Sequence, residues 1–277
     1  MGKYFLSTAG LCLLFTGLGF ARLGTATAQN RPDPPKVLTI EREFLKPGKA
    51  GSPHQKSESV FVQAFSDAKW PEHYLALDSM SGRLQTMFLA GYDSFAAWQK
   101  ASDAIAKNPT LAEVMDSTDV SDGELLDSYD TGTFVYDEDL SLRAPVRISD
   151  MRYMEFTIFN IRPGHCHDWN KLVKIYIQAW SKVPDAHWAM YEKWYGDTSS
   201  GGQYVVISPI KSLAEVDQER MDGKKMDVGL SADDKKKIAE LSAATIESEA
   251  TNLFAIDPKM SYVPDSWGKG SDFWGQK

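Results

Sequence analysis

The chain contains an internal repeat, and this repeat constrains the fold more than any other feature of the sequence. Blocks of similar residues recur in the same order at offsets of 114 to 120 positions. Val60–Ser66 (VFVQAFS) recurs as Ile175–Ser181 (IYIQAWS), and Leu45–Gly48 (LKPG) recurs as Ile161–Gly164 (IRPG). Collinear self-similarity at a nearly fixed offset is the signature of a duplicated structural unit. The chain is therefore interpreted as two copies of one unit in tandem.

Each copy predicts the order strand, helix, strand, strand, helix, strand, with an extra helix before the last strand. Apolar residues alternate in the first strand, and in the second copy they recur at helical spacing from Trp169 to Trp180. The predicted strands are 37–45, 73–80, 84–90 and 133–137 in the first copy, and 153–161, 187–194, 203–208 and 253–257 in the second. This order is the split βαβ, or ferredoxin-like, arrangement. It predicts an α+β fold of two ferredoxin-like repeats packed sheet to sheet as an intramolecular barrel.

This arrangement resembles the dimeric α/β-barrel superfamily, with the two halves fused in one chain, and looks closest to its antibiotic-biosynthesis-monooxygenase-like and NIPSNAP-like branches. The resemblance covers most of residues 37 to 264. It implies a barrel interior that binds a small molecule, because relatives include cofactor-free monooxygenases. Fused members such as chlorite-dismutase-like proteins and dye-decolourising peroxidases hold haem through an axial histidine.

The N-terminus has the composition of a secretory signal peptide. Lys3 precedes an apolar stretch over residues 4–21, and Ala26-Thr27-Ala28 offers a small-residue cleavage site. We expect an exported protein, periplasmic or secreted, with no integral membrane segment after cleavage. The predicted parts are the signal peptide 1–28, a linker 29–36, the first repeat 37–145, a linker 146–152, the second repeat 153–264 and a tail 265–277.

Charge and cysteine content exclude several classes of function. The formal net charge is −8, and cleavage removes Lys3 and Arg22 but no acid, which leaves −10. An acidic surface repels phosphate backbones, so we expect no nucleic-acid partner. Cys166 is then the only cysteine, so no intramolecular disulfide can form. The sequence leaves the oligomeric state open.

Three positions are candidates for ligand binding through their place in the repeat or on a strand. His73 and His187 occupy equivalent places in the two copies, so they could face a shared cavity or satisfy backbone groups. Arg42 lies on the first strand on the same side as the core-facing Leu38 and Ile40, and a buried arginine needs a carboxylate or an anionic ligand. By the same alternation, Glu41 and Glu43 are predicted to point outward.

His165-Cys166-His167-Asp168 precedes the main helix of the second copy. His165 and His167 could converge on a ligand, but the first copy has Lys49–Pro53 at this place and no second cluster has metal-ligand spacing. We therefore predict helix capping or a solvated loop here and no metal site. Tyr191 is a further ligand-binding candidate, one of several aromatic residues on elements expected to face the core.

Three functions remain open from the sequence. The first is binding of a small apolar or aromatic molecule in the barrel interior, with or without a monooxygenase-like step and without a cofactor. The second is haem binding of the chlorite-dismutase-like type through His187, His165 or His167. The third is a non-catalytic module for binding or interaction. Whether the protein is an enzyme is not decided by any motif, because no P-loop, dinucleotide fingerprint, nucleophile elbow or HExxH is present.

Overall fold

The computed structural model describes residues 33–197 and 201–275. The predicted signal peptide lies outside these residues. The first repeat contains β1 (Val37–Leu45), α1 (Ser52–Asp67), β2 (Tyr74–Ser79), β3 (Gln85–Tyr92), α2 (Phe95–Ala106), α3 (Pro109–Gly123) and β4 (Leu126–Leu142). The second contains β5 (Tyr153–Ile161), α4 (Cys166–Trp180), β6 (Trp188–Tyr195), β7 (Gln203–Ile210), α5 (Leu213–Gly229), α6 (Ala232–Thr245) and β8 (Ile246–Tyr262). A short 3-10 helix, η1 (Ile148–Asp150), lies between the repeats, and α7 (Asp265–Gly268) follows the second.

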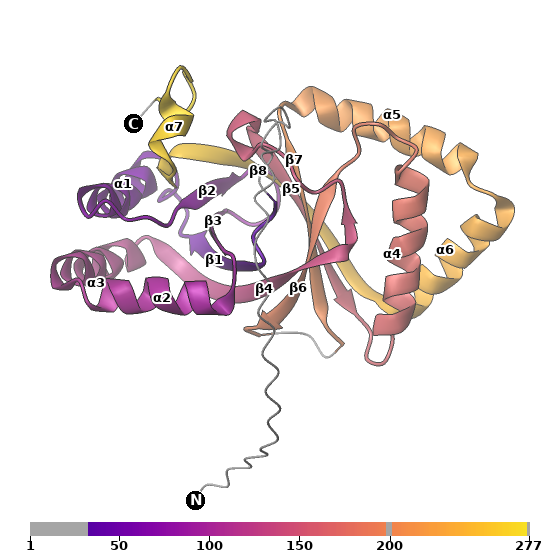
Figure 1. Ribbon diagram of the computed structural model, residues 1–277, viewed down its shortest axis with the longest axis horizontal. Helices are drawn as coiled ribbons and strands as arrows, with labels where there is room; N and C mark the ends of the chain where they lie inside the picture. Colours follow the sequence, from indigo (N-terminus) through magenta and orange to yellow (C-terminus); the bar gives the residue numbers. More distant parts are fainter. Residues whose placement is uncertain (1–32, 198–200, 276–277) are drawn as a thin grey trace, which may run out of the picture. The chain divides into compact units, whose positions relative to one another are not determined.

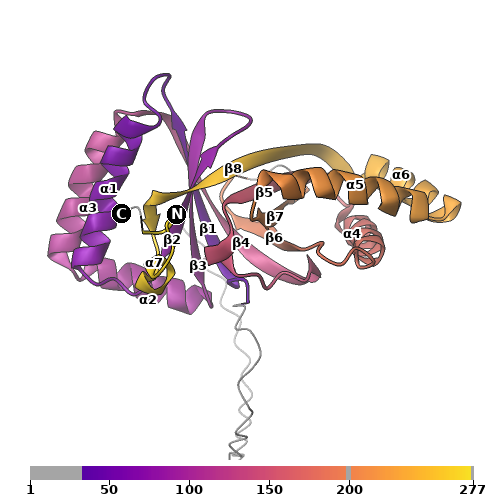
Figure 2. The ribbon, with the colours of Figure 1, turned by 90° about the horizontal axis from the view of Figure 1, so that it is seen from above.

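The two copies form one closed antiparallel barrel, and the predicted α+β class and barrel architecture are confirmed. The strand order around the barrel is β1-β3-β2-β8-β5-β7-β6-β4. Helices α1, α2 and α3 cover the strands of the first copy and α4, α5 and α6 those of the second (Figures 1 and 2). The two copies also turn alike, because Gly48 and Gly164 both adopt the left-handed conformation, at φ values of 80° and 81°, in the matching Pro-Gly turns.

The last strand of each copy is much longer than predicted, and this length closes the barrel. β4 and β8 each have 17 residues. The first part of each strand pairs within its own copy, β4 with β1 and β8 with β5. The second part pairs with the other copy, β4 with β6 and β8 with β2. The prediction of a short strand was wrong because residues 127–131 and 247–251 are solvent-exposed. An exposed stretch shows no apolar alternation, and alternation was the signal used to find strands.

The barrel interior is the largest apolar core, and the C-terminal tail belongs to it. The side chain of Trp274 is 1% exposed, and its Nε1 donates a hydrogen bond of 2.8 Å to the carbonyl of Ser149. The tail therefore contributes to the core. No helix within the described residues is both long and apolar enough to cross a membrane.

The two faces of β1 have different surroundings. Leu38, Ile40 and Arg42 face the barrel interior, as the alternation predicts. Glu43 points to the opposite face, as the alternation predicts, but α1 covers this face and Glu43 is only 7% exposed. Arg42 and Glu43, which are adjacent on β1, thus belong to two separate polar sites. Arg42 lies inside the barrel, and Glu43 lies between the sheet and α1.

Candidate functional site: a polar pocket at the mouth of the barrel

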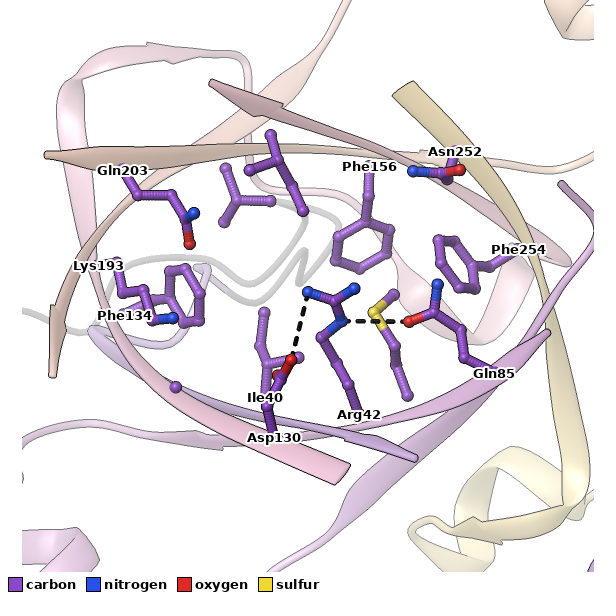
Figure 3. Close-up of a pocket in the computed structure, with 14 residues that line it drawn as sticks. Ile40, Arg42, Gln85, Asp130, Phe134, Phe156, Lys193, Gln203, Asn252 and Phe254 are labelled. Carbon is purple, nitrogen blue, oxygen red and sulfur yellow. Dashed lines mark hydrogen bonds and ion pairs between the residues drawn. The ribbon is translucent and has the colours of Figure 1, made fainter. Parts of the chain in front are cut away.

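A small pocket opens at one end of the barrel, toward the ends of β1 and β5 and the beginnings of β3 and β7 (Figure 3). The space open to the centres of water molecules is about 40 Å³, which is room for roughly three waters. Phe134, Phe156 and Phe254 form much of its wall, and Gln85, Gln203 and Asn252 add side-chain amides. The pocket is therefore apolar in its walls and polar at its mouth.

The pocket lies where the two copies meet, and equivalent residues from both line it. Twelve of the 14 lining residues form six pairs at the repeat offsets of 116, 118 and 120 positions. These pairs are Ile40 and Phe156, Arg42 and Ile158, Gln85 and Gln203, Met87 and Val205, Gly132 and Asn252, and Phe134 and Phe254. Lys193 and Asp130 complete the lining outside this pairing. All three charged residues of the pocket thus break its internal symmetry.

Arg42 is the central polar group of the pocket, and its guanidinium points into the barrel interior (Figure 3). Its Nε donates a hydrogen bond of 3.1 Å to Oε1 of Gln85, and its Nη1 lies 3.7 Å from Oδ2 of Asp130. The Asp130 side chain is 51% exposed, so water screens this ion pair. A guanidinium has five N–H donors, and within the described residues only one of them has a protein hydrogen-bond acceptor.

Lys193 adds a second positive charge at the mouth of the pocket. Its Nζ donates a hydrogen bond of 2.7 Å to the carbonyl of Asp197. Desolvation lowers the pKa of Lys193, the charge of Arg42 lowers it further, and the charge of Asp130 opposes both effects. Two cations therefore face one carboxylate, which leaves an excess of one positive charge when Lys193 is protonated.

Of the residues that the sequence singles out, Arg42 lines this pocket and the two equivalent histidines do not. The ring of His73 stacks on Tyr262 with centroids 5.1 Å apart. The ring nitrogens of His187 each lie 2.8 Å from a backbone carbonyl, those of Asp185 and Pro209. His187 therefore binds backbone groups, one of the two roles that its place in the repeat suggests.

The remaining candidates also lie away from the pocket. His165 precedes α4, with its Nδ1 3.4 Å from Oδ2 of Asp168, and His167 is exposed. Tyr191 is 2% exposed in the barrel core, where its ring lies 5.5 Å from that of Tyr136, and burial raises the pKa of its hydroxyl. The aromatic residues that do line the pocket come from strands β4, β5 and β8 and were not singled out.

The described residues do not form a haem site of the kind that the resemblance implies. An axial histidine must present a free ring nitrogen to a cavity large enough for the macrocycle. Both nitrogens of His187 are bound to carbonyls, His165 and His167 lie at the beginning of a surface helix, and the pocket lining contains no histidine. These three histidines therefore do not fit the role of an axial haem ligand.

Sequence reasoning missed most of the pocket. Gln85 and Gln203 could have been found, since they are identical at matching places of the repeat, whereas Lys193 and Asp130 carry no such signal. It also missed the described residues best placed to hold a metal ion, which lie on the opposite face of β1: Glu43, His54, Glu58 and Asp122.

No protein-family model and no curated protein sequence matches the chain. Solved structures do share its fold. A monooxygenase described as putative, from Fusobacterium nucleatum, aligns with a TM-score of 0.54 at 8% identity, over 81% of this chain and 93% of that one. An anthrone oxidase-like protein aligns with a TM-score of 0.49 at 14% identity, over 80% and 91%. A mutant chlorite dismutase from Candidatus Nitrospira defluvii aligns with a TM-score of 0.48 at 10% identity, over 81% and 93%.

At these identities the likeness is one of fold. The chain has the dimeric α/β-barrel fold, as its repeat predicts, with both halves in one polypeptide. A shared fold does not carry an activity, because function depends on the residues of the site.

Proposed function

We propose that the protein binds a small organic monoanion at the mouth of its barrel. The charged group of the ligand binds Arg42 and Lys193, and its short apolar part packs against the phenylalanine walls. This proposal depends on one observation: the Arg42 guanidinium lies in an apolar-walled pocket with unused donors and only a half-exposed carboxylate as counter-ion. A short carboxylate matches both the excess positive charge and the fork of N–H donors.

The pocket volume narrows the class of ligand. With room for roughly three waters, the pocket accepts a carboxylate with a few carbon atoms, whereas an aromatic ring would require side chains to move. The proposed ligand is therefore smaller and more polar than the aromatic molecule that the sequence suggests.

Binding is the part of the function that the pocket supports best. None of its described lining residues is histidine, cysteine or tyrosine, so Lys193 is the main candidate for proton exchange at neutral pH. A monooxygenase-like step is supported by the similarity of fold alone.

Calorimetric titration of the full chain with formate, acetate, propionate and butyrate tests the proposal, with propionamide as the neutral control. We expect at least one carboxylate to bind and propionamide not to bind. Arg42→Ile introduces isoleucine, the residue found at the equivalent position 158 of the second repeat, and it should abolish binding. Arg147→Ala, which removes an exposed arginine that lies 3.5 Å from Asp150 and does not line the pocket, should leave binding unchanged. Binding that survives Arg42→Ile, or no binding by any of these carboxylates, would refute the proposal.

A further inference from the structure

A second polar site is buried in the first repeat, between the outer face of the sheet and its helices. Glu43 from β1, His54 and Glu58 from α1, and Asp122 from α3 are 7%, 1%, 4% and 3% exposed. One nitrogen or oxygen atom from each lies within 4.8 Å of the corresponding atoms of the other three. His54 Nε2 lies 2.8 Å from Glu43 Oε2, 3.7 Å from Glu58 Oε1 and 3.9 Å from Asp122 Oδ1. Three acids thus surround one imidazole nitrogen with almost no access to water.

Two oxygens of this cluster have no hydrogen-bond donor. Within the described residues, no protein group donates to Glu58 Oε1 or Asp122 Oδ1. A buried polar atom without a partner destabilises the folded state, and more so when it is charged. Such atoms require an explanation, either a proton shared between the two acids or a cation.

His54 bonds Glu43 through Nε2 in this structure and has the orientation of a metal ligand. Its Nδ1 lies 3.3 Å from Oγ1 of Thr86, and Thr86 donates its own proton to Oδ1 of Asp78 over 2.6 Å. Because the Thr86 proton is used in this way, its oxygen accepts from Nδ1–H. Nε2 is then the nitrogen that faces the three acids. A ligating histidine commonly donates its other ring N–H to an oxygen outside the ligand shell, and the Thr86 hydroxyl, held by Asp78, takes that place here.

The second repeat shows that the fold does not need polar residues here. At the repeat offsets of 116, 115, 115 and 120 positions, the four residues correspond to Phe159, Trp169, Val173 and Ser242. Phe159 and Trp169 pack in an apolar cluster with ring centroids 4.8 Å apart, and Val173 is 4% exposed in the same cluster. The same scaffold thus contains an apolar core in one copy and three acids with a histidine in the other. Buried ionic groups that packing does not require point to a separate role.

We propose that Glu43, His54, Glu58 and Asp122 bind one divalent transition-metal ion. Zn²⁺ binds both imidazole nitrogen and carboxylate oxygen, and carboxylates also suit Mn²⁺, so one imidazole and three carboxylates are compatible with either ion. Ca²⁺ takes six to eight oxygen ligands and Mg²⁺ usually keeps several waters, so neither suits a nearly dry site with a nitrogen ligand. With four protein ligands the site is closed, which is typical of a structural metal that ties helices to a sheet. The ion would join α1 and α3 to β1.

The direct test is the metal content and stability of the untagged full chain, stripped with EDTA and dialysed against Zn²⁺ or Mn²⁺. We expect one ion per chain by elemental analysis. At a metal concentration 100 times Kd, the melting temperature should rise by roughly 5–10 °C. X-ray absorption of the zinc-loaded chain should show nitrogen and oxygen ligands near 2.0–2.2 Å and no sulfur, which separates this site from Cys166.

Variants locate the ion. Glu58→Gln and Asp122→Asn preserve shape and should each weaken binding at least about tenfold. His165→Ala/His167→Ala removes the histidines on either side of Cys166 and should still bind one ion. The proposal fails if neither metal binds the unaltered chain, if absorption shows a sulfur ligand, or if the double histidine variant alone loses the ion. The absorption measurement needs no variant, so it remains decisive if a substitution prevents folding.

Discussion

Glu58→Val tests most directly whether the buried acid cluster is costly to the fold. The substitution introduces valine, the residue found at the equivalent position 173 of the second repeat. Glutamate and valine occupy similar volumes, so no large cavity should form. It removes a carboxyl group that is 4% exposed and has one oxygen without a donor. Leaving such an atom unsatisfied costs about 1–3 kcal/mol, and Glu43 and Asp122 keep His54 as a partner when Glu58 is replaced. In EDTA the variant should therefore be more stable than the unaltered chain by about 1–3 kcal/mol, or roughly 2–12 °C in melting temperature.

Scanning calorimetry at neutral pH, with EDTA and then with Zn²⁺ or Mn²⁺, measures this effect. The order of stability should reverse when metal is added, because only the unaltered chain retains all four ligands. Val173→Glu is the matched control in the second repeat, where no histidine is available, and it should destabilise by more than about 3 kcal/mol. If Glu58→Val is less stable than the unaltered chain in EDTA, the acids already satisfy each other by sharing a proton, and the reasoning is refuted.

Three further outcomes are expected. Trp274→Ala should lower the free energy of unfolding by about 3–5 kcal/mol, measured by urea denaturation, because this side chain is 1% exposed in the barrel core; a loss below about 1 kcal/mol would show that the tail is not part of the core. Desolvation, with the charge of Glu219, raises the pKa of Glu155 above its usual 4.5, so this group favours the folded state below pH 4.5 and that contribution is lost as pH rises through the folded-state pKa. Glu155→Gln should therefore reduce the fall in stability above pH 4.5, and an unchanged pH profile would contradict the assignment. Expression in a bacterial host with its own N-terminus should give a mature protein that begins at Gln29, as read by N-terminal sequencing; an intact Met1 would exclude cleavage.

The sequence predicts the barrel well because the repeat carries information that no single element has. Matching blocks identify strands and helices in pairs, so a weak pattern in one copy is supported by the other. The prediction fails for the first halves of β4 and β8, whose exposed residues show no alternation. Arg42 was placed correctly from the period of two alone.

The metal cluster could not be predicted from spacing. Its ligands come from three elements and are separated by 11, 4 and 64 positions, so no short motif links them. A usable signal did exist in the alignment of the two copies, where Glu43, His54 and Glu58 stand opposite Phe159, Trp169 and Val173. Equivalent positions that differ in polarity identify this site, whereas agreement alone does not identify the pocket, because Gln85 and Gln203 line it and His73 and His187 do not.

Joining the two halves in one polypeptide has a consequence for the charge at the barrel mouth. In a homodimer of the first repeat, every substitution would appear twice about the twofold axis, and Arg42 would face a second guanidinium across a space of about 40 Å³. Like charges in so confined a space repel strongly. After duplication each half can mutate independently, so one wall can keep an arginine while the opposite wall keeps Ile158. The fused gene can therefore evolve an asymmetric site that a symmetric assembly of identical subunits could not hold.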